Sequence, residues 1–200
     1  MKTIELKIYN FNELSNEAKN KAITKQREYE YKWGEPLYFF KDTCKDKIEK
    51  AGFEDIIIEY SLNNSQGDGL SFSAGNYNKL ELLYLDILGK GKEKTAKLLA
   101  ENTTIQLTGN RGNYTYAHSN QVDLYFENQT SSINCIDISN IEDIQGQVLN
   151  KLSTIYMGLC GELEKEGYLE IQYYFSDENI INMIEDNDYE FLEDGKVFAQ

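Results

Sequence analysis

The side chains best placed to do chemistry lie in one polar turn of the chain. The turn consists of Ser65, Gln66, Gly67, Asp68 and Gly69. A mostly apolar stretch precedes it (Ile56, Ile57, Ile58 and Tyr60) and an alternating stretch follows it. This pattern predicts a β-hairpin whose two glycines supply the positive φ of a tight reversal. The polar groups and the glycine backbone could hold a small ligand or contact a partner. Alternatively, Ser65 and Asp68 only satisfy the amides of the turn itself.

We group His118, the only histidine of the sequence, with this turn as a loop of possible function. A histidine-based catalytic triad would have to use it, but triads form in space, so the nearby Ser119 and Asp123 do not indicate one. A single histidine without cysteine or aspartate at ligand spacing is also a poor metal site. We therefore predict no catalytic residue, no metal site and no cofactor, and a hydrogen-bonded histidine at a strand end is the alternative.

The charge of the chain is distributed very unevenly. Residues 1–111 carry 17 basic and 17 acidic side chains, whereas residues 112–200 carry 3 basic and 17 acidic ones, which accounts for the whole net charge of −14. An acidic half of this kind repels nucleic acid and attracts basic surfaces. The sequence therefore predicts no direct nucleic-acid binding. A solvated acidic face that only keeps the protein in solution is the alternative.

Acidic residues near the C-terminus are the predicted partner-binding residues. They are Glu178, Glu185, Asp186, Asp188, Glu190, Glu193 and Asp194. Their spacing does not match a calcium-binding EF-hand loop, and no matched acid and base for hydrolysis can be recognised among them. A surface that presents carboxylates to the basic groove of another protein fits them better, by electrostatic complementarity.

The elements that position these residues follow from hydrophobic periodicity. We predict strands at residues 3–9, 103–108, 114–118 and 121–127, besides the hairpin around the polar turn. We predict a helix capped by Ser15, a second one closed by Gly52, and helices over residues 78–88 and 93–100. The resulting fold class is α+β, with an antiparallel sheet of five or six strands and helices packed mainly on one face.

The C-terminal part contains the most regular pattern. Its apolar residues recur every three or four positions and predict one long helix that covers the sheet. They are Ile141, Ile144, Val148, Leu152, Ile155, Leu159 and Leu163. Glycines 158 and 161 are weak points of this helix, and Gly167 is expected to kink or end it. Ser176 predicts the cap of a last helix, and Asp194-Gly195 predicts a closing hairpin.

Size and composition limit the class of protein. The 200 residues, 40% of them hydrophobic, fit a single domain spanning 1–200 and argue against disorder. We expect no signal peptide, because the first residues lack an apolar segment, and no stretch is long and apolar enough to span a membrane. Three cysteines without paired spacing indicate buried, reduced thiols in a cytoplasmic protein.

Three segments together resemble a family of small phage and prophage proteins with a Ser-Gln-Gly-Asp-Gly turn. Members of that family are often labelled as the antitoxin of a toxin–antitoxin stability system. The segments are residues 11–22 (Phe-Asn-Glu-Leu-Ser-Asn-Glu-Ala-Lys-Asn-Lys-Ala), residues 60–69 with the turn, and residues 186–196. Arg111-Gly112-Asn113-Tyr114 followed by His118 is a looser match. Only Trp33 stands where the family has a tryptophan-rich segment.

The resemblance covers nearly the whole chain and implies an accessory protein of a mobile element, without implying a reaction. Together with the charge, it leads us to expect a non-enzymatic protein in the cytoplasm of a bacterial host. Its expected partner is a host protein with a basic surface, such as a nucleic-acid-binding defence effector, which it would inhibit as anti-CRISPR proteins do. An antitoxin that neutralises a cognate toxin is one alternative. A small-molecule binder or enzyme centred on residues 65–69 is another.

Overall fold

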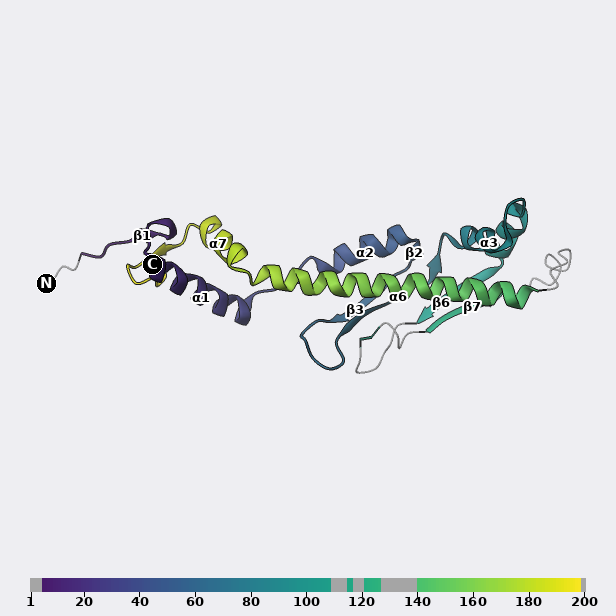
Figure 1. The fold of residues 1–200 in the computed structure, drawn as a ribbon, viewed down its shortest axis with the longest axis horizontal. Coiled ribbons are helices and arrows are strands. Elements are labelled where there is room, and N and C mark those ends of the chain that lie inside the picture. Colours follow the sequence, from purple (N-terminus) through teal and green to yellow (C-terminus); the bar gives the residue numbers. More distant parts are fainter. Residues whose placement is uncertain (1–4, 109–114, 117–120, 127–139, 199–200) are drawn as a thin grey trace. The chain divides into compact units, whose positions relative to one another are not determined.

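The computed structural model describes residues 5–108, 115–116, 121–126 and 140–198 (Figure 1). The chain divides into two compact units. The terminal unit comprises Met1–Tyr38 and Tyr168–Gln200, and the central unit comprises Phe39–Gly167. One helix, α6 (Ile141–Tyr174), contributes residues to both.

The terminal unit is built from both ends of the sequence. Its elements are β1 (Tyr9–Asn10), the 3₁₀ helix η1 (Phe11–Glu13), α1 (Asn16–Trp33), the end of α6, α7 (Asp177–Asp186) and β8 (Glu190–Phe191). A hydrophobic core joins α1 and α7 to the segment around η1 and β8. Its buried members are Phe11, Leu14, Ala18, Ala22, Ile23, Ile180, Ile184 and Phe191.

Serine caps begin both helices of this core, as the sequence predicts. The Ser15 hydroxyl accepts a hydrogen bond from the Ala18 backbone N–H at 3.2 Å, and Ser176 accepts one from the Asn179 N–H at the same distance. Each cap satisfies an amide that the first turn of a helix leaves without a partner. The predicted helix starts are therefore confirmed.

The predicted closing hairpin is also confirmed. β8 pairs antiparallel with β1, with Tyr9 opposite Phe191, and Phe191 is bridged in turn to Val197. The turn between them is closed by a bond from the Leu192 N–H to the Lys196 carbonyl at 2.8 Å. Gly195 has a φ of +80°, so a glycine suits the position that follows Asp194.

The central unit contains the hairpin and most of α6. Its elements are α2 (Phe40–Ala51), β2 (Phe53–Glu54), β3 (Ile57–Ser61), β4 (Gly69–Ser73), β5 (Asn76–Tyr77), α3 (Leu80–Leu88), α4 (Glu93–Glu101), β6 (Thr103–Thr108) and β7 (Gln121–Phe126). β3 and β4 form the predicted hairpin, with Glu59 opposite Ser71. Phe72 of β4 packs between Phe53 and Tyr156, with ring centroids 5.0 and 4.7 Å away. Gly52 closes α2 in the left-handed conformation, as predicted.

The predicted sheet of five or six strands is wrong. Within the described residues, the strands form four separate antiparallel pairs: β1 with β8, β2 with β5, β3 with β4, and β6 with β7. One isolated bridge, between Ala74 and Leu107, links the hairpin to β6. Four of the strands have only two residues, and four consecutive residues of β4 are buried beside helical elements. Packing against helices thus buries apolar surface that the prediction assigned to a wide sheet.

Two of the predicted strands do not appear as expected. Residues 5–8 of the first one adopt neither strand nor helix, and pairing begins only at Tyr9. Thr115 and Tyr116, which the structure describes from the second, lie outside any strand, and the rest of that segment is outside the described residues.

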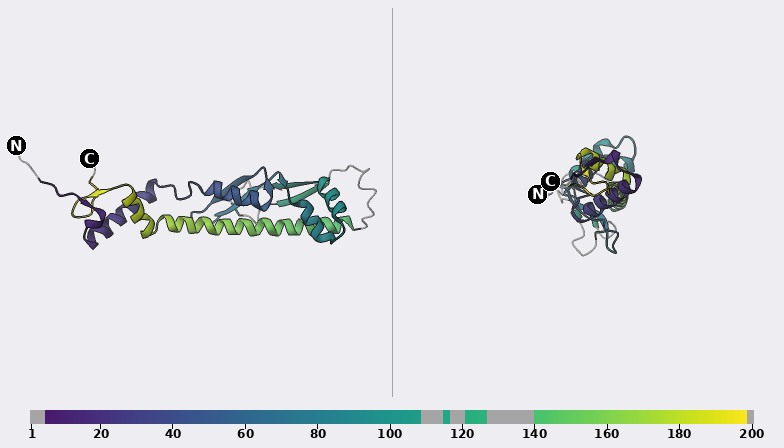
Figure 2. Two further views of the ribbon diagram at one scale, coloured as in Figure 1. Left: turned by 90° about the horizontal axis from the view of Figure 1, so that it is seen from above. Right: turned by 90° about the vertical axis from the view of Figure 1, so that its left-hand side faces the viewer.

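Helix α6 is continuous through all of its glycines (Figure 2). It therefore neither ends nor breaks at Gly167. Its buried residues are Val148, Leu152, Tyr156, Cys160, Leu163 and Gly167. The predicted positions Ile155 and Leu159 are only half-buried, so the stripe that packs into the central unit is displaced toward Tyr156 and Cys160.

At Gly167, side chains of other elements come close to the backbone of α6, and the missing side chain of glycine leaves room for them. A Cβ atom built there would collide with the Leu62 side chain and lie 2.8 Å from Phe40 Cζ. Both side chains are buried. The preceding residue, Glu166, forms an ion pair with Lys47 of α2, which lies alongside α6 (Figures 1 and 2). This hydrogen-bonded carboxylate raises the pKa of Lys47.

Substitution of α6 glycines by alanine tests this packing. Gly167→Ala is expected to lower the free energy of unfolding by about 1–2 kcal/mol, because overpacking outweighs the helix propensity of alanine. Gly158→Ala and Gly161→Ala are matched controls, since no atom lies within 4 Å of a Cβ at either position. Each control should raise the free energy by about 0.5–1 kcal/mol. Urea unfolding measures all three, and equal effects would contradict the close approach.

Candidate functional site

The predicted partner-binding acids all belong to the terminal unit. Glu178, Glu185 and Asp186 lie on α7, Asp188 lies in the turn that follows it, Glu190 lies in β8, and Glu193 and Asp194 lie in the closing hairpin. Each of the seven side chains is exposed. We call this set the acidic surface. All seven fall within the short segment 178–194, which one compact unit carries.

Two of these carboxylates are engaged inside the terminal unit. Glu185 accepts a hydrogen bond from the Asn12 side chain at 3.0 Å. Asp194 forms ion pairs with Lys21 and Lys196, both at 3.2 Å, and accepts a bond from the Lys196 backbone N–H. That N–H and the Lys196 ammonium, with a smaller contribution from Lys21, lower the pKa of Asp194 to about 2.

The other five acids differ from these two. Within the described residues, no ion pair or side-chain hydrogen bond is found for Glu178, Asp186, Asp188, Glu190 or Glu193. Asp188 has a φ of +50°, a conformation that aspartate and asparagine tolerate better than most residues. The turn that it forms brings the end of α7 to β8.

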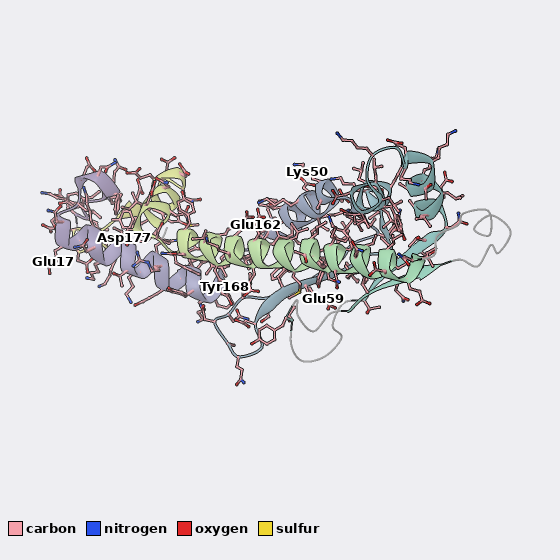
Figure 3. The ribbon with its side chains drawn as sticks, turned by 45° about the vertical axis from the view of Figure 1, so that its right-hand side comes forward. Glu17, Lys50, Glu59, Glu162, Tyr168 and Asp177 are labelled. Carbon is pink, nitrogen blue, oxygen red and sulfur yellow. The ribbon has the colours of Figure 1, made fainter. Side chains whose placement is uncertain are left out.

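A nearby acid that was not among the predicted partner-binding residues behaves differently. Asp177 begins α7 and forms an ion pair with Arg27, whose Nε also donates to the Phe175 carbonyl at 2.9 Å. Figure 3 shows Asp177 beside α1. Basic residues of α1 therefore neutralise Asp177 and Asp194, which fixes α7 and the hairpin in place. Among the seven predicted acids, only Asp194 forms an ion pair within the described residues, and Glu185 is bonded to a neutral amide.

The polar turn is held together by its own aspartate. Asp68 is buried, and its Oδ2 accepts a hydrogen bond from the Ser65 N–H at 2.8 Å. Its Oδ1 accepts one from the Ser61 hydroxyl at 2.7 Å. Gly67 and Gly69 have φ values of +100° and +155°, as the sequence predicts for this reversal. These contacts support the interpretation that Asp68 satisfies the turn itself.

A second segment of the central unit covers the turn. The Gly67 N–H donates to the Tyr116 hydroxyl at 2.7 Å, and the Thr115 N–H donates to the Gly67 carbonyl at 3.1 Å. A Cβ at Gly69 would lie 2.7 Å from the Thr115 carbonyl oxygen. Sequence reasoning missed this role of Tyr116, because nothing in the sequence pairs positions so far apart.

The remaining polar groups of the loop of possible function are placed as follows. Ser65 and Gln66 are exposed, whereas Gly67 and Gly69 are buried. The Ser71 hydroxyl, on the strand that leaves the turn, is fully buried and has no hydrogen-bond partner among the described residues. His118 lies outside the described residues.

Two of the cysteines can be assessed chemically. Cys44 and Cys160 are buried free thiols in the central unit, and Cys135 lies outside the described residues. Burial raises the pKa of the Cys160 thiol to about 12. Because the thiolate is the reactive form, Cys160 is not prepared to act as a nucleophile at neutral pH.

In the described part of the chain, no group of three or more histidine, cysteine, aspartate or glutamate side chains is arranged to hold a metal ion. No helix there is long and apolar enough to cross a membrane.

Removing the Asp68 carboxylate tests the structural role of the turn. Asp68→Ala should lower the free energy of unfolding by about 2–4 kcal/mol, because the Ser65 amide and the Ser61 hydroxyl both lose a charged acceptor. The control Gln66→Ala alters an exposed side chain of the same turn and should stay within about 0.5 kcal/mol of the wild type. Chemical denaturation measures both variants. An Asp68→Ala protein as stable as the control would contradict this role.

Asp194 gives a prediction on pH. Its pKa is lower in the folded chain than the usual value of about 3.9, so its ionised form stabilises the fold above pH 4. This contribution is lost as the pH falls toward 2, the folded pKa. The stability difference between the wild type and Asp194→Asn should therefore be constant above about pH 5 and shrink on acidification. Denaturant unfolding at a series of pH values checks this, and a pH-independent difference would contradict it.

Comparison with known proteins assigns no function to the acidic surface or to the polar turn. Comparison of the chain with protein-family models, with curated proteins and with solved structures found no match.

Proposed function

We propose that this protein is a non-enzymatic accessory protein of a phage or another mobile element that binds a host protein through the acidic surface. The observation that carries the proposal is a set of five exposed carboxylates that form no ion pair or side-chain hydrogen bond with any residue the structure describes. They are Glu178, Asp186, Asp188, Glu190 and Glu193. A lysine- or arginine-rich surface would supply the missing countercharges.

The arrangement of charges inside the terminal unit supports a binding role over a purely solubilising one. Arg27 and Lys21 pair with Asp177 and Asp194, so the positions of α7 and the closing hairpin are set by internal contacts. The five unpaired acids are therefore presented from ordered elements and lose little conformational freedom when a partner binds. Such preorganisation lowers the cost of association.

In the concrete version of the proposal, the partner is a defence effector that binds nucleic acid in the cytoplasm of a bacterial host. Its basic groove evolved to neutralise phosphates, and a row of carboxylates competes for the same cations. Occupying that groove would inhibit the effector without any reaction. An antitoxin would use the same surface against a toxin, and the identity of the captured partner separates these two functions.

Charge variants of the acidic surface test the proposal. The variant Asp186→Lys, Asp188→Asn, Glu190→Lys removes three unpaired carboxylates while keeping a residue that tolerates positive φ at position 188. A tagged pull-down from host lysate, read by mass spectrometry at low and high salt, should capture a basic protein with the wild type at low salt only. Binding of this partner should weaken at least about tenfold in the variant, because opposite charges become like charges.

The matched control changes the net charge equally in the central unit. Glu59→Lys, Glu81→Lys, Glu142→Gln alters three exposed acids that form no ion pair within the described residues. It should bind the partner nearly as the wild type does. If both variants lose the same binding affinity for the partner, the effect depends on net charge alone and a specific acidic surface is refuted.

A further inference from the structure

The segment Glu5–Ile8 continues β1 but pairs with no strand among the residues that the structure describes. Within the described residues, none of its backbone groups forms a backbone hydrogen bond. Figures 1 and 2 show it as an extended ribbon that enters β1. Leu6 and Ile8 are 54% and 41% exposed. An alternating segment with open backbone groups and exposed apolar side chains is a template for strand addition.

β8 does not pair with this segment because its own chain turns away. Continuing the register of Tyr9 with Phe191 would place Ile8 opposite Leu192. The Leu192 N–H instead bonds to the Lys196 carbonyl, which closes the hairpin. The ladder therefore stops at Tyr9, and the backbone of residues 5–8 stays available to another chain.

A groove of about 530 Å³ lies between this segment and the hairpin, entirely within the terminal unit. Its volume falls in the range of roughly 300–1,000 Å³ that is typical of ligand clefts. The lining residues are Glu5, Leu6, Lys7, Leu192, Glu193 and Asp194. Two leucines thus provide apolar surface. Of the three acids, Asp194 is paired with Lys21 and Lys196, so Glu5 and Glu193 stand against Lys7.

We infer that this groove binds an extended basic segment of the partner protein, which adds a strand to Glu5–Ile8. The inference rests on the proposed function for the nature of the partner. Backbone hydrogen bonds to residues 5–8 supply affinity, while alternate side chains of the incoming strand contact Leu6 and the carboxylates of Glu5 and Glu193. The matching segment alternates apolar residues with lysine or arginine.

The charge of the groove favours this occupant over a second copy of the chain. Residues 5–8 of another copy would bring one glutamate and one lysine, which leaves the acidic lining uncompensated. A basic segment compensates it. Asp194 already pairs with Lys21 and Lys196, so Glu5 and Glu193 are the acids that gain most.

A synthetic eight-residue peptide that alternates lysine and valine tests the inference by calorimetric titration of the full chain at low salt. We expect this peptide to bind. A glutamate–valine peptide should not bind, and neither should the lysine–valine peptide when its valine amides are methylated. Leu6→Pro should weaken binding at least about tenfold, because it removes an amide donor and apolar contact. Leu6→Val, which keeps both, should bind within about twofold of the wild type.

Each contrary result is decisive. Strand addition is overturned if the lysine–valine peptide does not bind. It is also overturned if Leu6→Pro or amide methylation leaves the binding unchanged. Equal binding of the acidic peptide overturns the basic preference. If the peptide does not bind, and the protein instead self-associates in a way that Leu6→Pro abolishes, the occupant is a second copy of the chain and the inference is overturned.

The captured partner separates this inference from the proposed function. If Leu6→Pro leaves capture intact while the Asp186, Asp188 and Glu190 variant loses it, the groove inference fails and the acidic surface stands. If the lysine–valine peptide binds as expected but no host protein is captured by the wild type, strand addition stands and the proposed function fails.

Discussion

The burial of one face of α6 is the constraint on which the central unit depends. Phe72 of the hairpin packs on Tyr156, and the absence of a side chain at Gly167 lets Phe40 and Leu62 approach the helix backbone. The same face carries Cys160, whose thiol is kept protonated by burial. Because interiors are close-packed, the surface of this helix positions the strands beside it, and among the described residues each of these strands pairs with only one other strand.

In the terminal unit, electrostatics divides the acids into two groups with different roles. Asp177 and Asp194 are paired with cations of α1 and the closing hairpin, so they hold the elements together. Within the described residues, their neighbours Glu178, Asp186 and Glu190 on α7 and β8 form no ion pair, and all three are exposed. Exposed pairs contribute little stability each. The main effect of the Asp177 and Asp194 ion pairs is therefore to orient the elements that carry the unpaired carboxylates.

Sequence reasoning succeeded where the signal is local and failed where it depends on distant partners. The Ser15 and Ser176 caps, the Gly52 terminus and both hairpins were predicted from neighbouring residues alone. The wide sheet was not formed, because strand pairing across the chain cannot be read from alternation. Likewise, the residues packed against α6 decide which of its side chains are buried. Tyr156 and Cys160 are buried, whereas the prediction had Ile155 and Leu159. In the candidate site, Asp68 was identified by its turn, whereas Tyr116 was not.

The composition of the terminal unit has a consequence for biosynthesis. Ala18 and Ala22 of α1 are synthesised before the central unit, whereas their core partners in α7 are synthesised after it. The central unit is one continuous segment, Phe39–Gly167, and can fold before α7 is made. The buried stripe of α1 therefore stays uncovered during that interval. Two of its three buried residues are alanines, which limits the apolar area exposed and with it the hazard of aggregation.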